Sequence, residues 1–106
     1  MNKLYDKLCK LIYEGDVLIS EHGYTELAED SLTAKEVISG IEKAKIIEEY
    51  PEYPKGPCLL LLQKDSCGNP IHAVWGIPKN QEKPAVLITA YKPDPLRWDK
   101  SFTRRL

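Results

Sequence analysis

The first part of the chain carries apolar residues at helical spacing. Leucine and isoleucine recur three or four positions apart, as Leu4, Leu8, Leu11 and Ile12. This spacing places them on one stripe and predicts a first helix that ends near Gly15. Further along, Ser20 offers a cap for a second, short helix. Thr33 and Glu36 form a capping box at the start of a third helix, which would contain Gly40.

The hydrophobic period then changes from helical to alternating. Four segments bounded by turn residues predict four strands, at 46–50, 58–63, 71–77 and 85–91. Short connections between successive strands indicate an antiparallel meander. We therefore expect one α+β domain over residues 1–106, with N-terminal helices on one face of an antiparallel sheet of about four strands. Its parts would be helices in 2–44, the sheet in 45–92 and a basic C-terminal tail in 93–106.

Alternation along the last two strands predicts which side chains share a face. The third strand would direct Ile71, Ala73, Trp75 and Ile77 to one face and His72, Val74 and Gly76 to the other. The fourth would direct Val86, Ile88 and Ala90 to one face and Leu87, Thr89 and Tyr91 to the other. The simplest pairing puts His72 beside Thr89 and Tyr91, opposite the core. A register slip of one residue would reverse this assignment.

Length and composition narrow the class of protein. A chain of 106 residues fits one domain, and 42% hydrophobic with 29% charged residues is ordinary for a globular protein. No apolar run approaches the roughly 20 residues that span a bilayer, and the N-terminus lacks the apolar core of a signal peptide. The three cysteines contain no Cys-x-x-Cys pair, so they indicate neither a disulfide framework nor a zinc knuckle. We expect a cytoplasmic protein with no membrane partner.

Charge is unevenly distributed, although the net charge is only -1. Residues 1–56 hold 12 acidic and 7 basic side chains, whereas residues 57–106 hold 4 acidic and 8 basic ones. The basic excess gathers near the C-terminus, in Lys92, Arg97, Lys100, Arg104 and Arg105. Such a tail can meet phosphate or an acidic partner, or it can be a solvated terminus with neither role.

Four short motifs occur in order along the chain. They are Ser20-Glu21-His22, Glu48-Glu49-Tyr50-Pro51, Gly68-Asn69-Pro70-Ile71-His72-Ala73-Val74 and Ile88-Thr89-Ala90-Tyr91-Lys92-Pro93. Through them the chain resembles, over roughly residues 17–95, a family of small bacterial proteins catalogued as a domain of unknown function. That family has been proposed to belong with the barnase–EndoU–colicin–RelE group of metal-independent ribonucleases and toxins. The resemblance implies a RelE-like or barnase-like fold.

The resemblance also implies site residues. His22 and His72 would be the family's two histidines, and Thr89 and Tyr91 its polar residues on the sheet face. Many relatives carry arginine four residues after the first histidine and again before the third helix, where this chain has Glu26 and Asp30. Because a ribonuclease needs cations near the scissile phosphate, these acids count against nuclease activity.

Two function hypotheses follow from these residues. In the first, the protein is an endoribonuclease, or a toxin with an antitoxin partner, that needs no metal or other cofactor. His22 and His72 would act as acid and base, Tyr91 and Thr89 would orient the substrate, and the basic tail would contact RNA. In the second, the protein is a non-catalytic binding module that uses the same sheet face for a partner protein or a small ligand.

The same residues also have purely structural interpretations. His72 can be a hydrogen-bonded strand histidine, and His22 a residue at a helix start that bonds to Glu26. A metal site formed by His22, Glu26 and His72 is a further alternative, although no Asp or Cys completes it. Of the two tryptophans, we expect Trp75 to pack in the core and Trp98 to dock the tail, rather than stack on bases.

Overall fold

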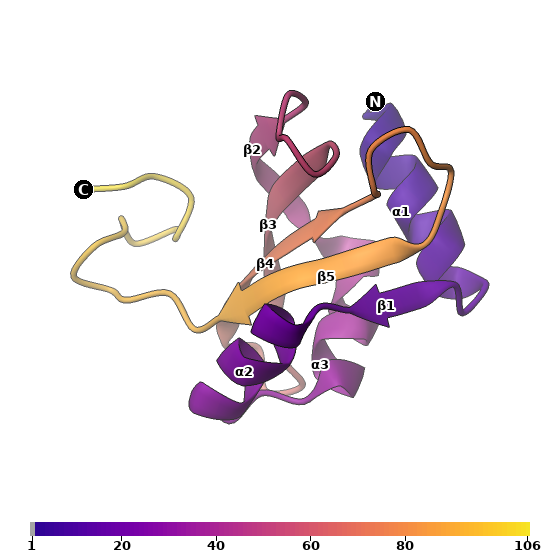
Figure 1. Ribbon diagram of the computed structural model, residues 1–106. Coiled ribbons are helices and arrows are strands. Elements are labelled where there is room, and N and C mark those ends of the chain that lie inside the picture. The colour runs from indigo at the N-terminus through magenta and orange to yellow at the C-terminus, as the bar shows by residue number, and fades with distance from the viewer. Residues whose placement is uncertain (1) are drawn as a thin grey trace.

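The structure, a computed structural model, describes residues 2–106 (Figure 1). Its elements are α1 (Lys3–Tyr13), β1 (Val17–Ile19), α2 (Glu21–Glu29), α3 (Ala34–Ser39), the 3-10 helix η1 (Gly40–Lys43), β2 (Lys45–Tyr50), β3 (Cys58–Lys64), β4 (Pro70–Gly76) and β5 (Ala85–Tyr91). All three predicted helices are present. The third is shorter than expected, because it divides at Gly40 into α3 and η1. Within the described residues, none of these helices is long and apolar enough to cross a membrane.

Both predicted caps are present. The Ser20 hydroxyl accepts a hydrogen bond from the Gly23 amide at 2.9 Å and thereby fixes where α2 begins. Thr33 and Glu36 form the reciprocal bonds of a capping box at the start of α3. Each cap satisfies amides that a helix leaves without an intrahelical partner at its first turn.

The sheet has five strands, in the order β1-β5-β4-β3-β2. The expectation of four strands, all antiparallel, is therefore corrected: the short apolar run Val17–Ile19 forms β1, which pairs in parallel with β5. The other neighbours are antiparallel, as predicted. A run of three residues is too short for its own pattern to distinguish a strand from a connection, and the partner of β1 lies far away in sequence.

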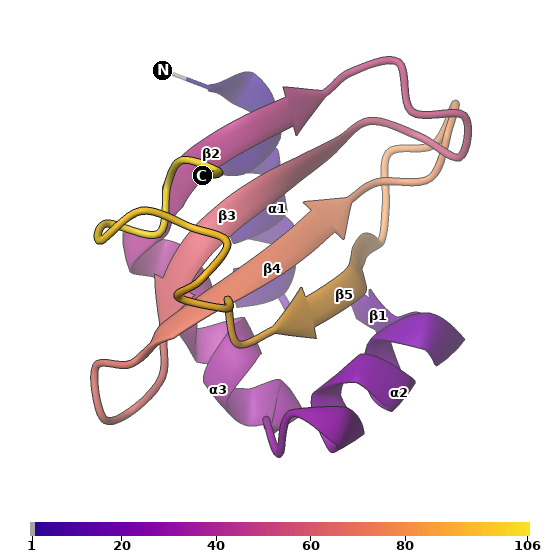
Figure 2. The same cartoon turned by 90° about the vertical axis from the view of Figure 1, so that its left-hand side faces the viewer.

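Helices α1 and α3 lie on one face of the sheet, and the C-terminal segment lies on the opposite face. Figure 2 shows α1 and α3 behind β2, β3 and β4, and the segment after β5 passing in front of them. We call residues 93–106 the C-terminal segment, and the sheet face that it crosses the outer face. The inner face packs against the helices through a core that includes Leu8, Val37, Ile41, Leu61, Ile71, Ala73, Trp75 and Leu87. The α+β class is thus confirmed, with α1 and α3 covering one face of the sheet.

A buried amide links the helices to this core. The Gln63 side chain donates to the Val37 carbonyl at 2.7 Å and accepts from the Trp75 indole at 3.0 Å. Gly40 packs directly against it, since a Cβ added at Gly40 would lie 2.8 Å from the Gln63 side-chain nitrogen. A side chain larger than that of glycine would therefore collide with Gln63 at this position.

A β-bulge in β5 corrects the predicted division of its faces. Val74 pairs with Thr89 but the next residue, Trp75, pairs with Leu87, so Ile88 is an extra residue. The alternation therefore shifts phase at Ile88. Leu87 and Ala90 both lie in the core, whereas the sequence pattern placed them on opposite faces.

Candidate functional site

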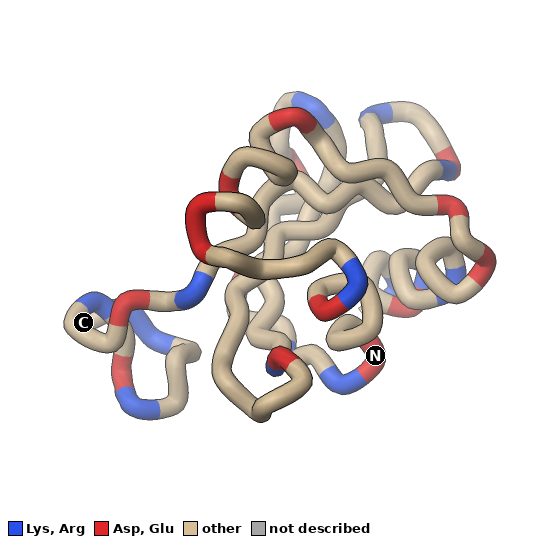
Figure 3. The backbone as a smooth tube through the Cα atoms, turned by 90° about the horizontal axis from the view of Figure 1, so that it is seen from below, with Lys and Arg blue, Asp and Glu red and all other residues tan. Residues whose placement is uncertain are grey.

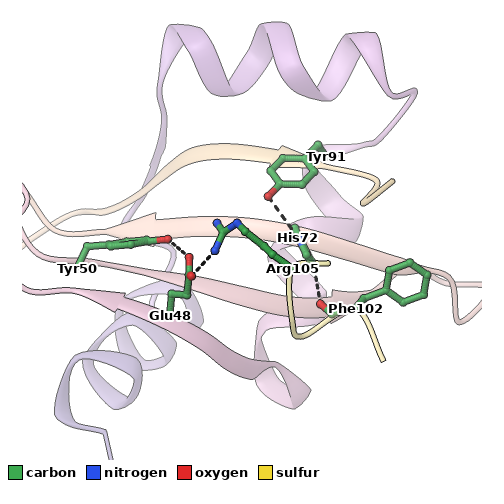
Figure 4. Close-up of polar contacts among 6 residues, drawn as sticks. All are labelled: Glu48, Tyr50, His72, Tyr91, Phe102 and Arg105. Carbon is green, nitrogen blue, oxygen red and sulfur yellow. Dashed lines mark hydrogen bonds and ion pairs between the residues drawn. The ribbon is translucent and has the colours of Figure 1, made fainter. Parts of the chain in front are cut away.

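The outer face gathers polar side chains from three strands. His72 pairs with Tyr91 across β4 and β5, and Val74 pairs with Thr89, which puts His72, Thr89 and Tyr91 on one face as predicted. Glu48 and Tyr50 on β2 belong to the same face (Figure 4). The bulge at Ile88 makes this possible, because it lets Thr89 and Tyr91 face outward while Leu87 stays in the core.

His72 is fully buried, although it lies on the outer face. Its Nε2 is 2.7 Å from the Phe102 carbonyl oxygen and its Nδ1 is 3.3 Å from the Tyr91 hydroxyl. A carbonyl only accepts, so Nε2 carries the proton and Nδ1 accepts from Tyr91. The Trp98 ring covers the imidazole edge to face, with centroids 4.4 Å apart. Both ring nitrogens are therefore occupied and shielded from solvent.

The surroundings of His72 favour its neutral form. Burial lowers the pKa of His72 below its usual 6.5, and the positive charge of Arg105 lowers it further. The hydrogen bond to the Phe102 carbonyl, which is a larger influence than the Arg105 charge, and the smaller effect of the Glu48 charge both raise this pKa, but together they do not offset burial and Arg105. Burial also raises the pKa of Tyr91. Neither partner of this hydrogen-bonded pair is therefore charged near neutral pH.

The C-terminal segment provides the cover over His72. Trp98 is only 7% exposed, which confirms its expected docking role. Trp98 and Arg105 form an isolated antiparallel bridge that closes the segment into a loop. Phe102 has a φ of 60°, a left-handed conformation that is rare for a bulky side chain. The Phe102 carbonyl is the group that accepts the hydrogen bond from His72.

An ion pair holds the end of the C-terminal segment to the sheet. The Arg105 guanidinium donates to one carboxylate oxygen of Glu48, and the Tyr50 hydroxyl donates to the other (Figure 4). Arg105 also lies over the Trp98 ring, 4.8 Å from its centroid. The hydrogen bonds from Arg105 and Tyr50 lower the pKa of Glu48, and the pair raises that of Arg105.

Sequence reasoning missed this pair. Glu48 was singled out only as part of a motif, and Arg105 only as part of a basic tail. The two residues are 57 positions apart, so no local spacing connects them.

His22 occupies a different environment, at the start of α2. Its side chain is 64% exposed, and Nε2 lies 3.4 Å from the Glu26 carboxylate, as the spacing of four residues predicted. The start of α2 is tied to β5 because the Ser20 hydroxyl donates to the Ile88 carbonyl at 2.9 Å. His22 thereby stands at the rim of the outer face.

Two adjoining hollows contain His22. The larger, of about 760 Å³, lies between α2, β5 and the β2–β3 connection and includes His22, Thr25, Tyr53, Lys55, Val86 and Ile88. The smaller, of about 350 Å³, brings His22 together with Tyr50 and Thr89. We call the two together the His22 groove. His72 lines neither hollow, so the described residues do not present the two imidazoles in one cavity.

The described residues do not bring the three side chains of the metal alternative together. Among residues 2–106, no group of three or more His, Cys, Asp or Glu side chains is arranged to hold an ion. His22 and Glu26 lie together on α2, but both ring nitrogens of His72 are bonded to groups of the protein.

Comparison with known proteins identifies the family. Residues 19–92 match the family described as a domain of unknown function, DUF4258. The match covers more than half of the chain, so the protein belongs to this family. No curated protein and no solved structure matches the chain. The proposed kinship with the RelE and barnase group stays a prediction. The C-terminal segment that covers His72 lies outside the matched residues.

Proposed function

We propose that the protein is a ligand-binding module rather than an enzyme, and that the His22 groove holds its ligand. The observation that carries this proposal is the burial of His72. The chain has two histidines, and an acid–base pair needs two that a substrate can reach. His72 is 0% exposed with both nitrogens engaged, so His22 is the one imidazole available on this surface.

The lining of the groove indicates the class of ligand. Val86 and Ile88 contribute apolar side chains to its lining, while His22, Thr25 and Lys55 contribute polar groups. Sites for small molecules typically enclose about 300–1,000 Å³ and combine apolar walls with a few hydrogen-bonding groups. A small organic molecule with a flat apolar body and a polar edge fits this lining.

Binding can be tested with ring-containing probes. Indole, benzoate and adenine are titrated into the labelled full chain while the backbone amide signals of Thr25 and Ile88 are followed by NMR. We expect at least one probe to shift both signals, and Ile88→Gln to weaken that binding by about tenfold. Leu18→Gln makes the same kind of change at an exposed side chain on β1, outside the groove, and should leave binding within about twofold. No shift with any probe, or equal weakening by both variants, would overturn the proposal.

A second candidate function is metal-independent RNA cleavage, in an RNase-like or toxin-like protein. Its support is that the smaller hollow joins His22 with Thr89 and Tyr50, on the same face as His72 and Tyr91. His22 and His72 would be acid and base, and Thr89 and Tyr91 would orient the substrate. This function requires the C-terminal segment to leave His72.

Cleavage of RNA in EDTA separates the two functions. The full chain, a His22→Ala/His72→Ala double variant and Arg105→Gln are incubated with the same RNA. Arg105→Gln removes the charge that pairs with Glu48 and so loosens the cover over His72. A ligand-binding module should give equal, negligible cleavage in all three. Cleavage by the full chain that increases in Arg105→Gln and disappears in the double variant would establish the ribonuclease instead.

A further inference from the structure

A second cleft lies where β5 ends and the C-terminal segment begins. It encloses about 660 Å³, and its lining includes Tyr91, Lys92, Leu96, Arg97, Arg105 and Leu106. Apart from Tyr91 at the end of β5, these residues belong to the connection after β5 and to the C-terminal segment. Neither the His22 groove nor any expected role of His22 or His72 accounts for this cleft.

The cleft has a basic excess. Lys92, Arg97 and Arg105 contribute to its lining, against a single acid, Asp94, and the charge of Arg105 is already paired with Glu48. Figure 3 shows basic positions recurring along the C-terminal segment, with acidic positions between them. Among the residues that the structure describes, the Lys92 side chain makes no ion pair. Arg97 is 84% exposed and only 3.9 Å from Asp94 at its nearest, which is a weak pair. Lys92 and Arg97 can therefore bind carboxylates of a partner.

The same cleft exposes large apolar side chains. Leu96 is 83% exposed and Leu106 is 80% exposed, and both belong to its lining. Two exposed leucines lie beside Lys92, which makes no ion pair within the described residues, and beside the weakly paired Arg97. This mixed apolar and basic surface complements a segment in which acidic and apolar side chains alternate.

The aromatic residues argue against nucleic acid as the occupant. Single-stranded RNA is held by stacking its bases on accessible aromatic rings. The Trp98 ring is only 7% exposed, since it lies between His72 and Arg105. Leucine side chains cannot replace such a stacking platform. The charge of the cleft attracts any polyanion, but its apolar part favours a peptide.

We propose that this cleft binds an acidic segment of a partner protein, with carboxylates on Lys92 and Arg97 and an apolar side chain between Leu96 and Leu106. The proposal goes beyond the small-molecule site and does not depend on it, because the two surfaces differ in position, charge and lining.

A synthetic peptide of alternating glutamate and leucine provides the probe. It carries a fluorescent label and is titrated into the full chain at low and high salt, with fluorescence anisotropy as the readout. Peptides in which glutamine replaces glutamate, or serine replaces leucine, are titrated in parallel. We expect the parent peptide to bind more weakly at high salt, and both altered peptides to lose at least about tenfold in affinity.

Variants of exposed residues locate the binding. Arg97→Glu reverses one charge of the cleft, and Lys35→Glu makes the same change of net charge on α3, on the other side of the sheet. We expect about a tenfold loss with Arg97→Glu, several-fold with Leu96→Ser, and less than about twofold with Lys35→Glu.

Three results would overturn the proposal. The first is absence of binding by the parent peptide. The second is an equal loss with Arg97→Glu and Lys35→Glu, which would indicate attraction to net charge alone. The third is that an oligouridylate binds more tightly than the peptide and is weakened by Arg97→Glu, since the cleft would then be a nucleic-acid surface.

Discussion

The protonation of His72 provides the sharpest test of its role. If His72 is a buried, neutral anchor for the C-terminal segment, adding a proton to it must cost folding free energy. The ring is 0% exposed, and Nε2 already donates to the Phe102 carbonyl. A second proton would place a charge at Nδ1, near the positive Arg105. The perturbation is therefore a decrease of pH, and the quantity measured is the free energy of unfolding.

The direction and the maximum slope of this change in unfolding free energy with pH follow from the pKa of His72. The pKa of His72 is lowered in the folded state, whereas in the unfolded chain it is about 6.5. At any pH between these two pKa values, the unfolded chain therefore binds more protons than the folded protein. The contribution of neutral His72 to the free energy of unfolding is then fully present above a pH of about 6.5. It decreases as the pH falls below this value, and it stops changing below the pKa of the folded state. One proton limits the slope to about 1.4 kcal/mol per pH unit. Glu48 and Asp99, whose pKa values are lowered, lose their contribution only at lower pH.

The assay is urea unfolding followed by tryptophan fluorescence between about pH 7.5 and 5.5. The wild-type chain should lose stability across this range. His72→Gln, which keeps a neutral donor and acceptor but cannot titrate, should remove most of the slope, whereas His22→Gln should retain it. NMR titration of the His72 ring in the wild-type chain provides the direct check, with a pKa below 6.5 expected. A flat wild-type profile, or an unchanged slope in His72→Gln, would refute the assignment.

Three further substitutions test the contacts that shape the fold and the cover. Gly40→Ala places a methyl group 2.8 Å from the Gln63 amide; it should cost about 1–3 kcal/mol in urea unfolding, because a buried hydrogen-bonding group is displaced. Thr33→Ala removes an exposed helix cap and should cost about 1 kcal/mol by the same measurement. Arg105→Gln breaks the pair with Glu48; it should change global stability by less than about 1 kcal/mol but speed hydrogen exchange in the C-terminal segment.

Features with a local physical cause could be predicted from the sequence. Ser20 and Thr33 cap helices because their hydroxyls reach amides three residues ahead. The outward position of His72 beside Tyr91 follows from strand alternation and a short connection between strands. The inward position of Trp75 has the same origin.

Features set by distant partners could not be predicted. The strand β1 is defined by its parallel pairing with β5, which no local pattern encodes. The bulge at Ile88 shifts the alternation without a glycine or proline to mark it. The cover over His72 depends on Phe102 and on the pair between Arg105 and Glu48, contacts that join the C-terminal segment to β4 and β2.

These long-range contacts decide what the outer face can do. An imidazole that pairs with a tyrosine on an exposed sheet face is a candidate for acid–base chemistry. The same imidazole under Trp98 and the Phe102 carbonyl is shielded from substrate and hydrogen-bonded within the protein. The residues that change its role lie beyond the part of the chain that defines the family, which ends at residue 92. The motifs around His22 and His72 are therefore not sufficient to assign an activity to this protein. Its chemistry has to be judged from the strands and the C-terminal segment together.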